Sequence, residues 1–570
     1  MIILTTRRKA VQNSLFWVLF CAAACFLLWK CRYGFANVDE SFYLTIPYRL
    51  WMGDGLFGQE WHLSQMAGFL LLPFMAVYML FSGGSTEGIL LAFRYVFTCV
   101  QGMTAVFLYF RLKKYSWTGS CIASLVFFLY APFGIMALSY NSMGILCLTV
   151  SSVLLVTNDR DRGIEYAISG LFFAAAVLCC PYLAAVYFLY SLIVLIQRLH
   201  PFCDWTCLSG KCWLWLTGGV VALAVLFCGF VLSRTSISAI AAAFPSIMQD
   251  PEHATRSFSY LLKSYFESIF IRNTGWKYIA LGLLALWVIR MADRKHRIHG
   301  TVFFFLGAVL TAAMMVPFVT DNRYINFIMF PLNLFALLCG SLTQNKLVKK
   351  LLLTVWLPGI LYSFCIHMAS NQYFYAISSA STVSLTASIL ITVLTARELI
   401  FDAPKMLPKA LAALTLVCLM GLQMGGLVSL RYTSVFWETS MEEQTVRMET
   451  GPEKGLLVTP WRKQHYEAFL ADTASFREEN RAASVLYLSE YTWLYLAGEG
   501  IEMSPYSAWL AGVNENTVAR LTAYYELNPE KLPQVVYAER KYAEFALELC
   551  GRYGYETETS AMGNLVFILR

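Results

Sequence analysis

Long apolar runs separated by short polar segments occupy most of the chain up to about residue 430. A run of about 20 apolar residues is needed for a helix to cross a bilayer. The pattern therefore predicts a polytopic α-helical membrane protein with about 13 transmembrane helices. The predicted spans cover residues 14–29, 89–110, 117–136, 143–157, 164–180, 182–198, 213–233, 276–290, 300–319, 324–342, 351–369, 374–395 and 410–430.

One shorter apolar run, residues 68–81, decides how the loops alternate. It has 14 residues, which is short for a span, so it is predicted to lie in the membrane interface. With that choice, 20 of the 30 basic residues before Arg431 fall in cytoplasmic loops, as the charge bias of membrane proteins favours. The alternative of 14 spans would reverse most of those loops. We therefore predict a multi-pass protein of the plasma membrane, with the N-terminus in the cytoplasm and the C-terminal part outside.

Composition agrees with a membrane protein and separates two parts. The chain of 570 residues is 58% hydrophobic and 14% charged, whereas soluble domains carry about 25% charged residues. From residue 431 onward, 13 basic and 20 acidic residues give a net charge of −7, and the rest carries +14. We predict a transmembrane domain at 1–430 and a small extracytoplasmic α/β domain at 431–570, where short apolar strands alternate with helical segments. The basic residues are spread over short loops, so a nucleic-acid partner is excluded.

Ionisable side chains gather in the first outer loop, residues 31–88, where Asp39 and Glu40 stand together and Glu60 and His62 follow. Charged groups beside a bilayer are costly and tend to be kept for function, although acids in an outer loop can also simply be solvated. A carboxylate anchored just after the first helix suits a general base that takes a proton from an acceptor hydroxyl or amine. Asp39 is the leading candidate. Glu40 is a partner or only a neighbour, because adjacent residues point in different directions.

Further side chains are candidates for substrate binding. His62 would share one face of an extended backbone with Glu60, and it would either hydrogen-bond a sugar or phosphate or cap a nearby turn. Arg323 lies at the outer end of a predicted span, where a guanidinium suits a phosphate. It could equally pair with Asp321 or reach the lipid headgroups. Arg256, in a long outer segment, has the same alternatives.

Together, the span layout and the first-loop acids resemble the GT-C superfamily of membrane glycosyltransferases. The resemblance is to the protein O-mannosyltransferases and the aminoarabinose transferases of lipid A. Those families carry an acidic residue just after the first helix and a second acid in the same loop. Asp39 and Glu40 match the first acidic site, and Glu60 matches the second by position. Arg323 and Tyr324 resemble the family's late Arg-Tyr motif near its lipid-phosphate site.

Residues 139–142, Ser-Tyr-Asn-Ser, are predicted to form a short outer turn. Oligosaccharyltransferase relatives carry an acidic, metal-linked motif at this place, and Asn141 stands here instead of an acid. Asn141 is a substrate-binding candidate by this resemblance. No metal ligand and no certain cofactor are predicted, and a divalent metal stays an alternative that these residues do not support. The run Phe93-Arg94-Tyr95, which opens the second span, is also similar to the family.

The resemblance implies a glycosyltransferase that moves a sugar, with inversion, from a polyprenyl-phosphate carrier to a lipid, protein or cell-wall polymer acceptor at the outer face. Asp39 would be the base, with Glu40 as its partner or only its neighbour. Glu60 and His62 would orient the acceptor or the sugar, and Arg323 would hold the leaving phosphate. One alternative is a transporter or flippase of lipid-linked sugars, a class that often shows internal repeats, which are not seen in this chain. Another is a non-catalytic cell-envelope scaffold, which would not need the acids.

Overall fold

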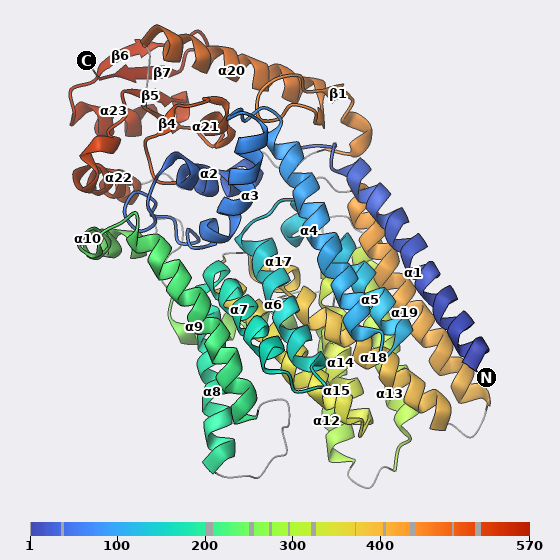
Figure 1. Ribbon diagram of the computed structural model, residues 1–570. Helices are drawn as coiled ribbons and strands as arrows, with labels where there is room; N and C mark the ends of the chain where they lie inside the picture. The colour runs from blue at the N-terminus through green and yellow to red at the C-terminus, as the bar shows by residue number, and fades with distance from the viewer. Residues whose placement is uncertain are drawn as a thin grey trace.

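A computed structural model describes residues 2–35, 39–199, 209–249, 256–272, 276–293, 297–320, 327–370, 372–402, 406–433, 439–480, 484–507 and 515–569. Most of the chain is a bundle of long helices, and a small mixed α/β part covers one end of it (Figure 1). The bundle helices are α1 (Ile2–Lys30), α4 (Ile89–Leu112), α5 (Trp117–Leu129), α6 (Tyr140–Thr157), α7 (Gly163–Cys179), α8 (Ala184–Leu199), α9 (Gly210–Leu232), α12 (Lys277–Ala292), α13 (Gly300–Thr320), α14 (Pro331–Leu342), α15 (Lys346–Leu351), α16 (Leu357–Met368), α18 (Thr382–Asp402) and α19 (Met406–Thr433).

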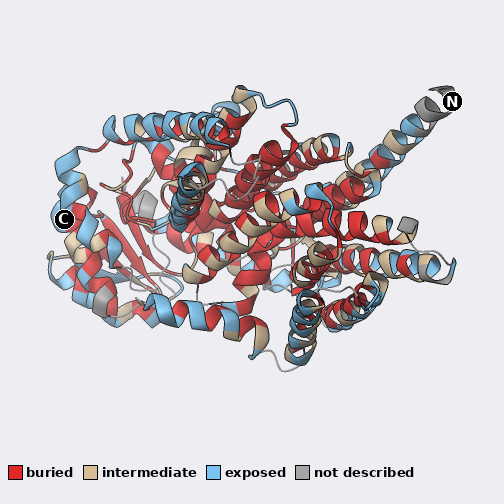
Figure 2. Ribbon diagram, turned by 90° about the horizontal axis from the view of Figure 1, so that it is seen from below, coloured by how far each residue is buried: buried red, intermediate tan, exposed pale blue. Residues whose placement is uncertain are grey.

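Nine helices within the described residues are long and apolar enough to cross a membrane. Every predicted span overlaps a helix, so the helical membrane class is confirmed in this form, while the number of 13 spans stays a prediction. The outer faces of several helices are exposed (Figure 2), and their exposed side chains are large and apolar. On α9, for example, Leu214 is 74% and Val225 65% exposed. Such a belt suits lipid rather than water.

Small residues let some bundle helices approach closely. A Cβ on Gly170 of α7 would lie 1.9 Å from the carbonyl oxygen of Leu216, and one on Gly219 of α9 would lie 1.8 Å from that of Ala167. Any side chain at either position would therefore push α7 and α9 apart. Close backbone approach through glycine is how helices gain packing energy in lipid, where burial of apolar surface gives little.

Serine side chains cap the N-terminal ends of several helices. Ser116, Ser209, Ser236 and Ser257 each accept a hydrogen bond from a backbone N–H of the first helical turn, which satisfies a donor that has no partner within the helix. Ser139 forms a reciprocal capping box at the start of α6. The expectation of a short turn at 139–142 was therefore wrong, because this cap turns the segment into the first turn of a helix.

Five shorter helices lie outside the long ones: α2 (Asp39–Met52), α3 (Ala67–Phe81), α10 (Ile237–Met248), α11 (Phe258–Phe270) and α17 (Tyr373–Ala380). Helix α3 matches the run for which an interfacial position was predicted, and it packs on α2, where Gly68 lies against Ile46. The two helices that flank this region in the chain, α1 and α4, run in opposite directions. At the lower end of α4, the Lys113 ammonium lies 3.4 Å from Asn13 Oδ1 near the start of α1.

This arrangement gives an expected result for topology. A cysteine at Lys113 should be labelled from the same side of the membrane as one at Lys9, because the two ends of α1 and α4 lie together. A cysteine at Lys454, in the C-terminal part, should be labelled from the opposite side. Impermeant maleimide labelling of intact cells, compared with permeabilised cells, measures this. Labelling of Lys113 and Lys454 from one side would mean that α3 crosses the membrane.

The C-terminal part contains a five-stranded sheet in the order β4-β3-β5-β7-β6. Strands β4, β3 and β5 are parallel, and β7 and β6 are antiparallel. The elements are β1 (Val446–Arg447), β2 (Leu457–Val458), α20 (Pro460–Asn480), β3 (Ser484–Leu488), α21 (Trp493–Ala497), β4 (Glu502–Met503), α22 (Glu515–Leu527), β5 (Val535–Ala538), α23 (Ala543–Gly551), β6 (Glu556–Thr559) and β7 (Leu565–Ile568). Both faces of the central strands are buried, as the uninterrupted apolar runs predicted.

The two faces of the sheet pack into clusters that include residues of the first loop. Val485 belongs to the same cluster as Phe35 and Met75. The neighbouring Leu486 points to the other face and shares a cluster with Trp61. The C-terminal part is thus not a separate body beside the bundle, because its core continues into the segment that carries the predicted site.

Candidate functional site

The candidate site is built on the short linker between α1 and α2. Arg94 of α4 donates hydrogen bonds to three carbonyl oxygens of that linker, those of Cys31 (2.7 Å), Tyr33 (3.1 Å) and Gly34 (2.9 Å). The same guanidinium binds both carboxylate oxygens of Glu40, at 2.5 and 2.6 Å. On its other side the linker pairs with strand β2. Glu40 is therefore fully used in fixing the backbone, and its position supports a positioning role rather than proton transfer.

Asp39 opens α2, one residue before this clamp. All five acidic residues of the loop 31–88 are described, and Asp39 alone among them forms no ion pair with another described residue. Each of the other four lies within 3.6 Å of a lysine or arginine nitrogen; they are Glu40, Asp54, Glu60 and Glu87. Burial raises the pKa of the Asp39 carboxyl from 3.8 to about 6. At neutral pH the group is mostly ionised, and it is a stronger base than an ordinary aspartate.

Aromatic and amide side chains surround this carboxylate. Tyr43 follows Asp39 by one turn of α2, and burial, the Tyr140 phenol and the Asp39 carboxylate all raise its pKa. The Nδ2 atom of Asn141 donates to the Tyr43 hydroxyl at 3.4 Å. The rings of Tyr43 and Tyr140 meet edge to face, with centroids 5.5 Å apart. The first turn of α6 thus brings Asn141 into the group around Asp39.

Helix α17 adds Tyr375 to the group. Its hydroxyl donates to the carbonyl oxygen of Phe133 at 3.0 Å, in the connection between α5 and α6, where Phe133 has a left-handed φ of 56°. Burial and the Tyr130 phenol raise the pKa of Tyr375. The Arg431 guanidinium lowers this pKa, and the Asp39 carboxylate raises it further. Tyr375 therefore interacts electrostatically with both the Asp39 carboxylate and the buried Arg431 guanidinium.

Arg431 is one of two buried cations in this region. Lys30 ends α1 and is 3% exposed; Arg431 lies near the end of α19 and is 2% exposed. The two helix ends are neighbours, since the rings of Trp29 and Tyr432 are 6.4 Å apart, and Figure 1 shows α1 and α19 side by side. The charges of Lys30 and Arg431 repel each other.

Neither cation is compensated by a carboxylate. Among the described residues, no acidic side chain pairs with either of them, and Lys30 Nζ and Arg431 Nε have no hydrogen-bond partner. Among the described residues, the phenols of Tyr130 and Tyr375 interact with the Arg431 guanidinium. Burying an unpaired charge is unfavourable, so a bound anion would stabilise Lys30 and Arg431.

Glu60 is placed away from this group. It has no exposed surface, and its carboxylate accepts hydrogen bonds from the backbone N–H groups of His62 (2.8 Å) and Ser507 (3.0 Å). Arg49 Nε lies 3.6 Å from it. These contacts join the first loop to the C-terminal part and leave the carboxylate no access to a substrate. The part of Glu60 in catalysis stays a prediction, and this geometry supports a role in joining the first loop to the C-terminal part.

A chain of buried charges continues this connection. Arg49 Nε donates to Asp54 Oδ2 at 2.7 Å, and Lys531 bridges Asp54 and Glu502 through its ammonium. Lys531 is in the C-terminal part, and Arg49 and Asp54 are in the first loop. Removing one member of such a network leaves an unpaired buried charge, at a cost of about 3–5 kcal/mol. The C-terminal part therefore holds α2, and with it Asp39, in place.

His62 packs beside α2 rather than next to Asp39. Its ring lies 4.8 Å from that of Phe42, centroid to centroid. Its Nδ1 accepts from the backbone N–H (3.1 Å) and the hydroxyl (2.7 Å) of Ser64. Two donors at Nδ1 favour the neutral tautomer with its proton on Nε2. This contact fits the alternative that His62 stabilises a turn.

Of the two arginines predicted to bind substrate, Arg256 lies within the described residues and Arg323 does not. Arg256 lies just before α11, with its guanidinium 5.6 Å from the centre of the Tyr260 ring, and it does not contact the group around Asp39. Arg323 and Tyr324 lie outside the described residues, so their predicted role stays a prediction. Within the part of the chain that the structure describes, no cluster of three or more His, Cys, Asp or Glu side chains is placed to hold a metal ion.

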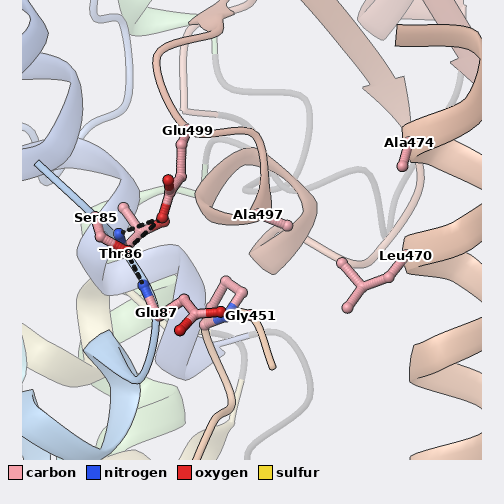
Figure 3. A pocket seen from close by; sticks show the side chains of 9 residues that line it. Ser85, Thr86, Glu87, Gly451, Leu470, Ala474, Ala497 and Glu499 are labelled. Atoms are coloured by element: carbon pink, nitrogen blue, oxygen red, sulfur yellow. Dashed lines mark hydrogen bonds between the residues drawn. The ribbon is translucent and has the colours of Figure 1, made fainter. Parts of the chain in front are cut away.

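A pocket of about 420 Å³ opens elsewhere, between the segment before α4 and the C-terminal part (Figure 3). Its polar wall is formed by Glu499, whose Oε1 accepts from Ser85 Oγ (2.5 Å) and from the backbone N–H of Thr86 (3.1 Å). Leu470 and Ala474 of α20 line the opposite wall. None of the predicted site residues lines this pocket, and its contacts serve to hold the two parts together.

Sequence reasoning missed Lys30, Arg431 and the role of Arg94. One signal was available for the first two. Both are basic residues at predicted outer ends of spans, against the usual preference for basic residues in the cytoplasm. Arg94 could be singled out only as part of the Phe93-Arg94-Tyr95 run. Its ion pair with Glu40 spans 54 residues, and no local sequence pattern shows such a pairing.

Comparisons with known proteins give little further assignment. No family model and no curated protein matches the chain. Two solved structures of the archaeal oligosaccharyltransferase AglB from Archaeoglobus fulgidus are similar to it. One, in complex with an inhibitory peptide and a dolichol-phosphate, is 13% identical with a TM-score of 0.42; the other, tethered to an acceptor peptide, is 12% identical with a TM-score of 0.40. Each match covers 98% of this chain and 74% of that protein. At these scores, the likeness assigns no residue and no activity.

Proposed function

We propose that the protein is a membrane glycosyltransferase that transfers a sugar, with inversion, from a polyprenyl-phosphate carrier to an acceptor at the outer face of the plasma membrane. One observation carries the proposal. Asp39 has a raised pKa and no ion pair among the described residues, and it interacts with Tyr375, which also interacts with Arg431 of the buried Lys30–Arg431 pair. A base together with two buried cations suits a reaction in which a lipid phosphate departs.

In the proposed mechanism, the Asp39 carboxylate accepts the proton of an acceptor hydroxyl or amine. The acceptor atom then forms a bond to the anomeric carbon from the face opposite the phosphate. The bond between that carbon and the phosphate oxygen breaks, and the electron pair leaves with the carrier phosphate. Arg431 and Lys30 stabilise the charge that develops there, because fixed cations in a water-poor site act strongly on a leaving anion. The ion pair between Arg94 and Glu40 fixes the backbone that carries Asp39.

Two sets of residues are proposed for the donor phosphate. The sequence predicted that Arg323 binds the leaving phosphate, and this role stays a proposal. Arg431 and Lys30 have the stronger claim, because their charges are buried and unmatched within the described residues. The transporter alternative remains the second candidate, since the same cations could hold a lipid phosphate without chemistry. It gives no reason for a carboxyl held at a pKa of about 6.

The pH dependence of transfer tests the proposal. Asp39 works as a base only when ionised, so its contribution is present above a pH of about 6 and is lost as the pH falls through that value. We expect kcat/KM to fall about tenfold for each pH unit below 6. The assay uses proteoliposomes, radiolabelled polyprenyl-phosphate mannose or glucose, and a membrane extract as acceptor. An acidic limb near 4, as for an exposed aspartate, would exclude Asp39 as the base; no transfer from any carrier-linked sugar would favour the transporter.

A further inference from the structure

A second group of cations and aromatic rings lies beside the proposed site, around α11 and the start of α17. The guanidinium carbon of Arg272 is 4.6 Å from the centre of the Tyr373 ring, and that of Arg256 is 5.6 Å from the centre of the Tyr260 ring. Tyr260 is 42% and Tyr373 37% exposed. We call these four residues the Arg-Tyr cluster.

The cluster has a net positive charge. Glu267 is its acidic neighbour on α11, 3.1 Å from Arg272 and 3.6 Å from Lys263, so one carboxylate faces two cations. Arg256 has no carboxylate partner among the described residues. The Arg272 guanidinium and the Tyr260 hydroxyl lower the pKa of the Tyr373 phenol. The side chains thus form one contact group rather than independent surface charges.

The backbone is strained at Tyr373, which belongs to the Arg-Tyr cluster. Tyr373 has a φ of 47°, a left-handed conformation that is unfavourable for a residue with a bulky side chain. Strain of this kind persists where the surrounding structure enforces it, often at ligand sites. Tyr375, two residues later, is the phenol that interacts with both Asp39 and Arg431. The start of α17 therefore presents one tyrosine to the Arg-Tyr cluster and another to the proposed reaction centre.

We propose that the Arg-Tyr cluster is the acceptor subsite of the proposed transferase, and that it takes an anionic glycan, a sugar chain bearing phosphate or carboxylate groups. Exposed phenol rings offer flat apolar faces on which sugar rings can pack. Guanidinium groups bind phosphate and carboxylate oxygens in pairs. The cluster combines both, and its Tyr373 is two residues from Tyr375, which interacts with the proposed base. This assignment rests on the proposed function, but binding at the cluster can be measured without any transfer.

The test compares binding of two tetrasaccharides to the full-length protein in nanodiscs of phosphatidylcholine: a hexuronate tetrasaccharide and neutral maltotetraose. The wild type should bind the hexuronate more tightly, and its advantage should shrink with added salt. Arg272→Gln and Arg256→Gln should each weaken hexuronate binding about tenfold, as expected for the loss of a charge-assisted contact. Maltotetraose binding should change little. Lys277→Gln is the matched control, because it removes a cation from a tyrosine ring, 5.0 Å away, without touching the cluster.

Two outcomes would overturn this assignment. Equal affinities of the wild type, Arg256→Gln and Arg272→Gln for the hexuronate would mean that no anionic glycan binds there. If instead the variants changed only the response to phosphatidylglycerol added to the nanodiscs, the cluster would bind lipid headgroups. Hydrolysis of the carrier-linked sugar, with water as acceptor, separates this question from the proposed function. It should persist in both arginine variants, and its absence in the wild type would count against the transferase itself.

Discussion

Asp39→Asn should lower sugar transfer by roughly 10²–10⁴, the contribution expected of a general base. An amide has nearly the same size and still accepts hydrogen bonds, but it cannot take up the acceptor's proton. Asp39 makes no ion pair among the described residues, so the substitution breaks no salt bridge. We therefore expect normal insertion and normal thermal unfolding. Transfer from a radiolabelled carrier, measured at matched protein levels, checks the result.

Glu40→Gln serves as the neighbouring control. Its carboxylate is bound through both oxygens by Arg94, so this variant should lose stability because the buried guanidinium is left with its charge unpaired. Transfer per folded molecule should fall less than for Asp39→Asn, and the acidic limb of the pH profile should stay near 6. If Asp39→Asn kept full transfer while Glu40→Gln lost it without unfolding, the base would be Glu40. Full transfer in both would favour the transporter.

The sequence predicted much of the fold because its strongest signals are local. Apolar runs of membrane length became helices, and the apolar segments at residues 484–488, 535–538 and 565–568 became strands β3, β5 and β7. The edge strands β4 and β6 were not foreseen. They are short or polar, as β6 is with its Glu-Thr-Glu-Thr sequence, and only pairing with their neighbours makes them strands.

The candidate site was less predictable because its parts come from distant segments. The sequence could rank Asp39 first from its place after α1, but it could not tell which of the first-loop acids were already paired. That depends on Arg94 in α4 and on Lys531 near the end of the chain. Such partners are chosen by packing, and no local pattern records them. Because the other first-loop acids form ion pairs, Asp39 is the first-loop carboxylate left without one among the described residues. The sequence alone could not show this.

The unpaired cations give the second large expected effect. Arg431→Met should lower transfer roughly tenfold to a hundredfold, as expected for the loss of a charge-assisted phosphate contact worth about 1.5–3 kcal/mol. The same substitution should raise the midpoint of thermal unfolding, because it removes a buried charge that no carboxylate compensates among the described residues. Gain of stability with loss of function is typical of a site that is strained for its ligand.

Arg94→Met is the matched control for this expectation. Both arginines are buried, but Arg94 is paired with Glu40, so its removal should lower the unfolding midpoint. Added polyprenyl phosphate should raise the midpoint of the wild type, since a ligand that binds only the folded state stabilises it, and it should do so much less in Arg431→Met. Arg431→Lys keeps the charge but loses the planar fork, so it should recover only part of the transfer. If Arg431→Met destabilised the protein as much as Arg94→Met and still responded fully to the carrier, Arg431 would be a structural residue. The donor phosphate would then have to be held elsewhere.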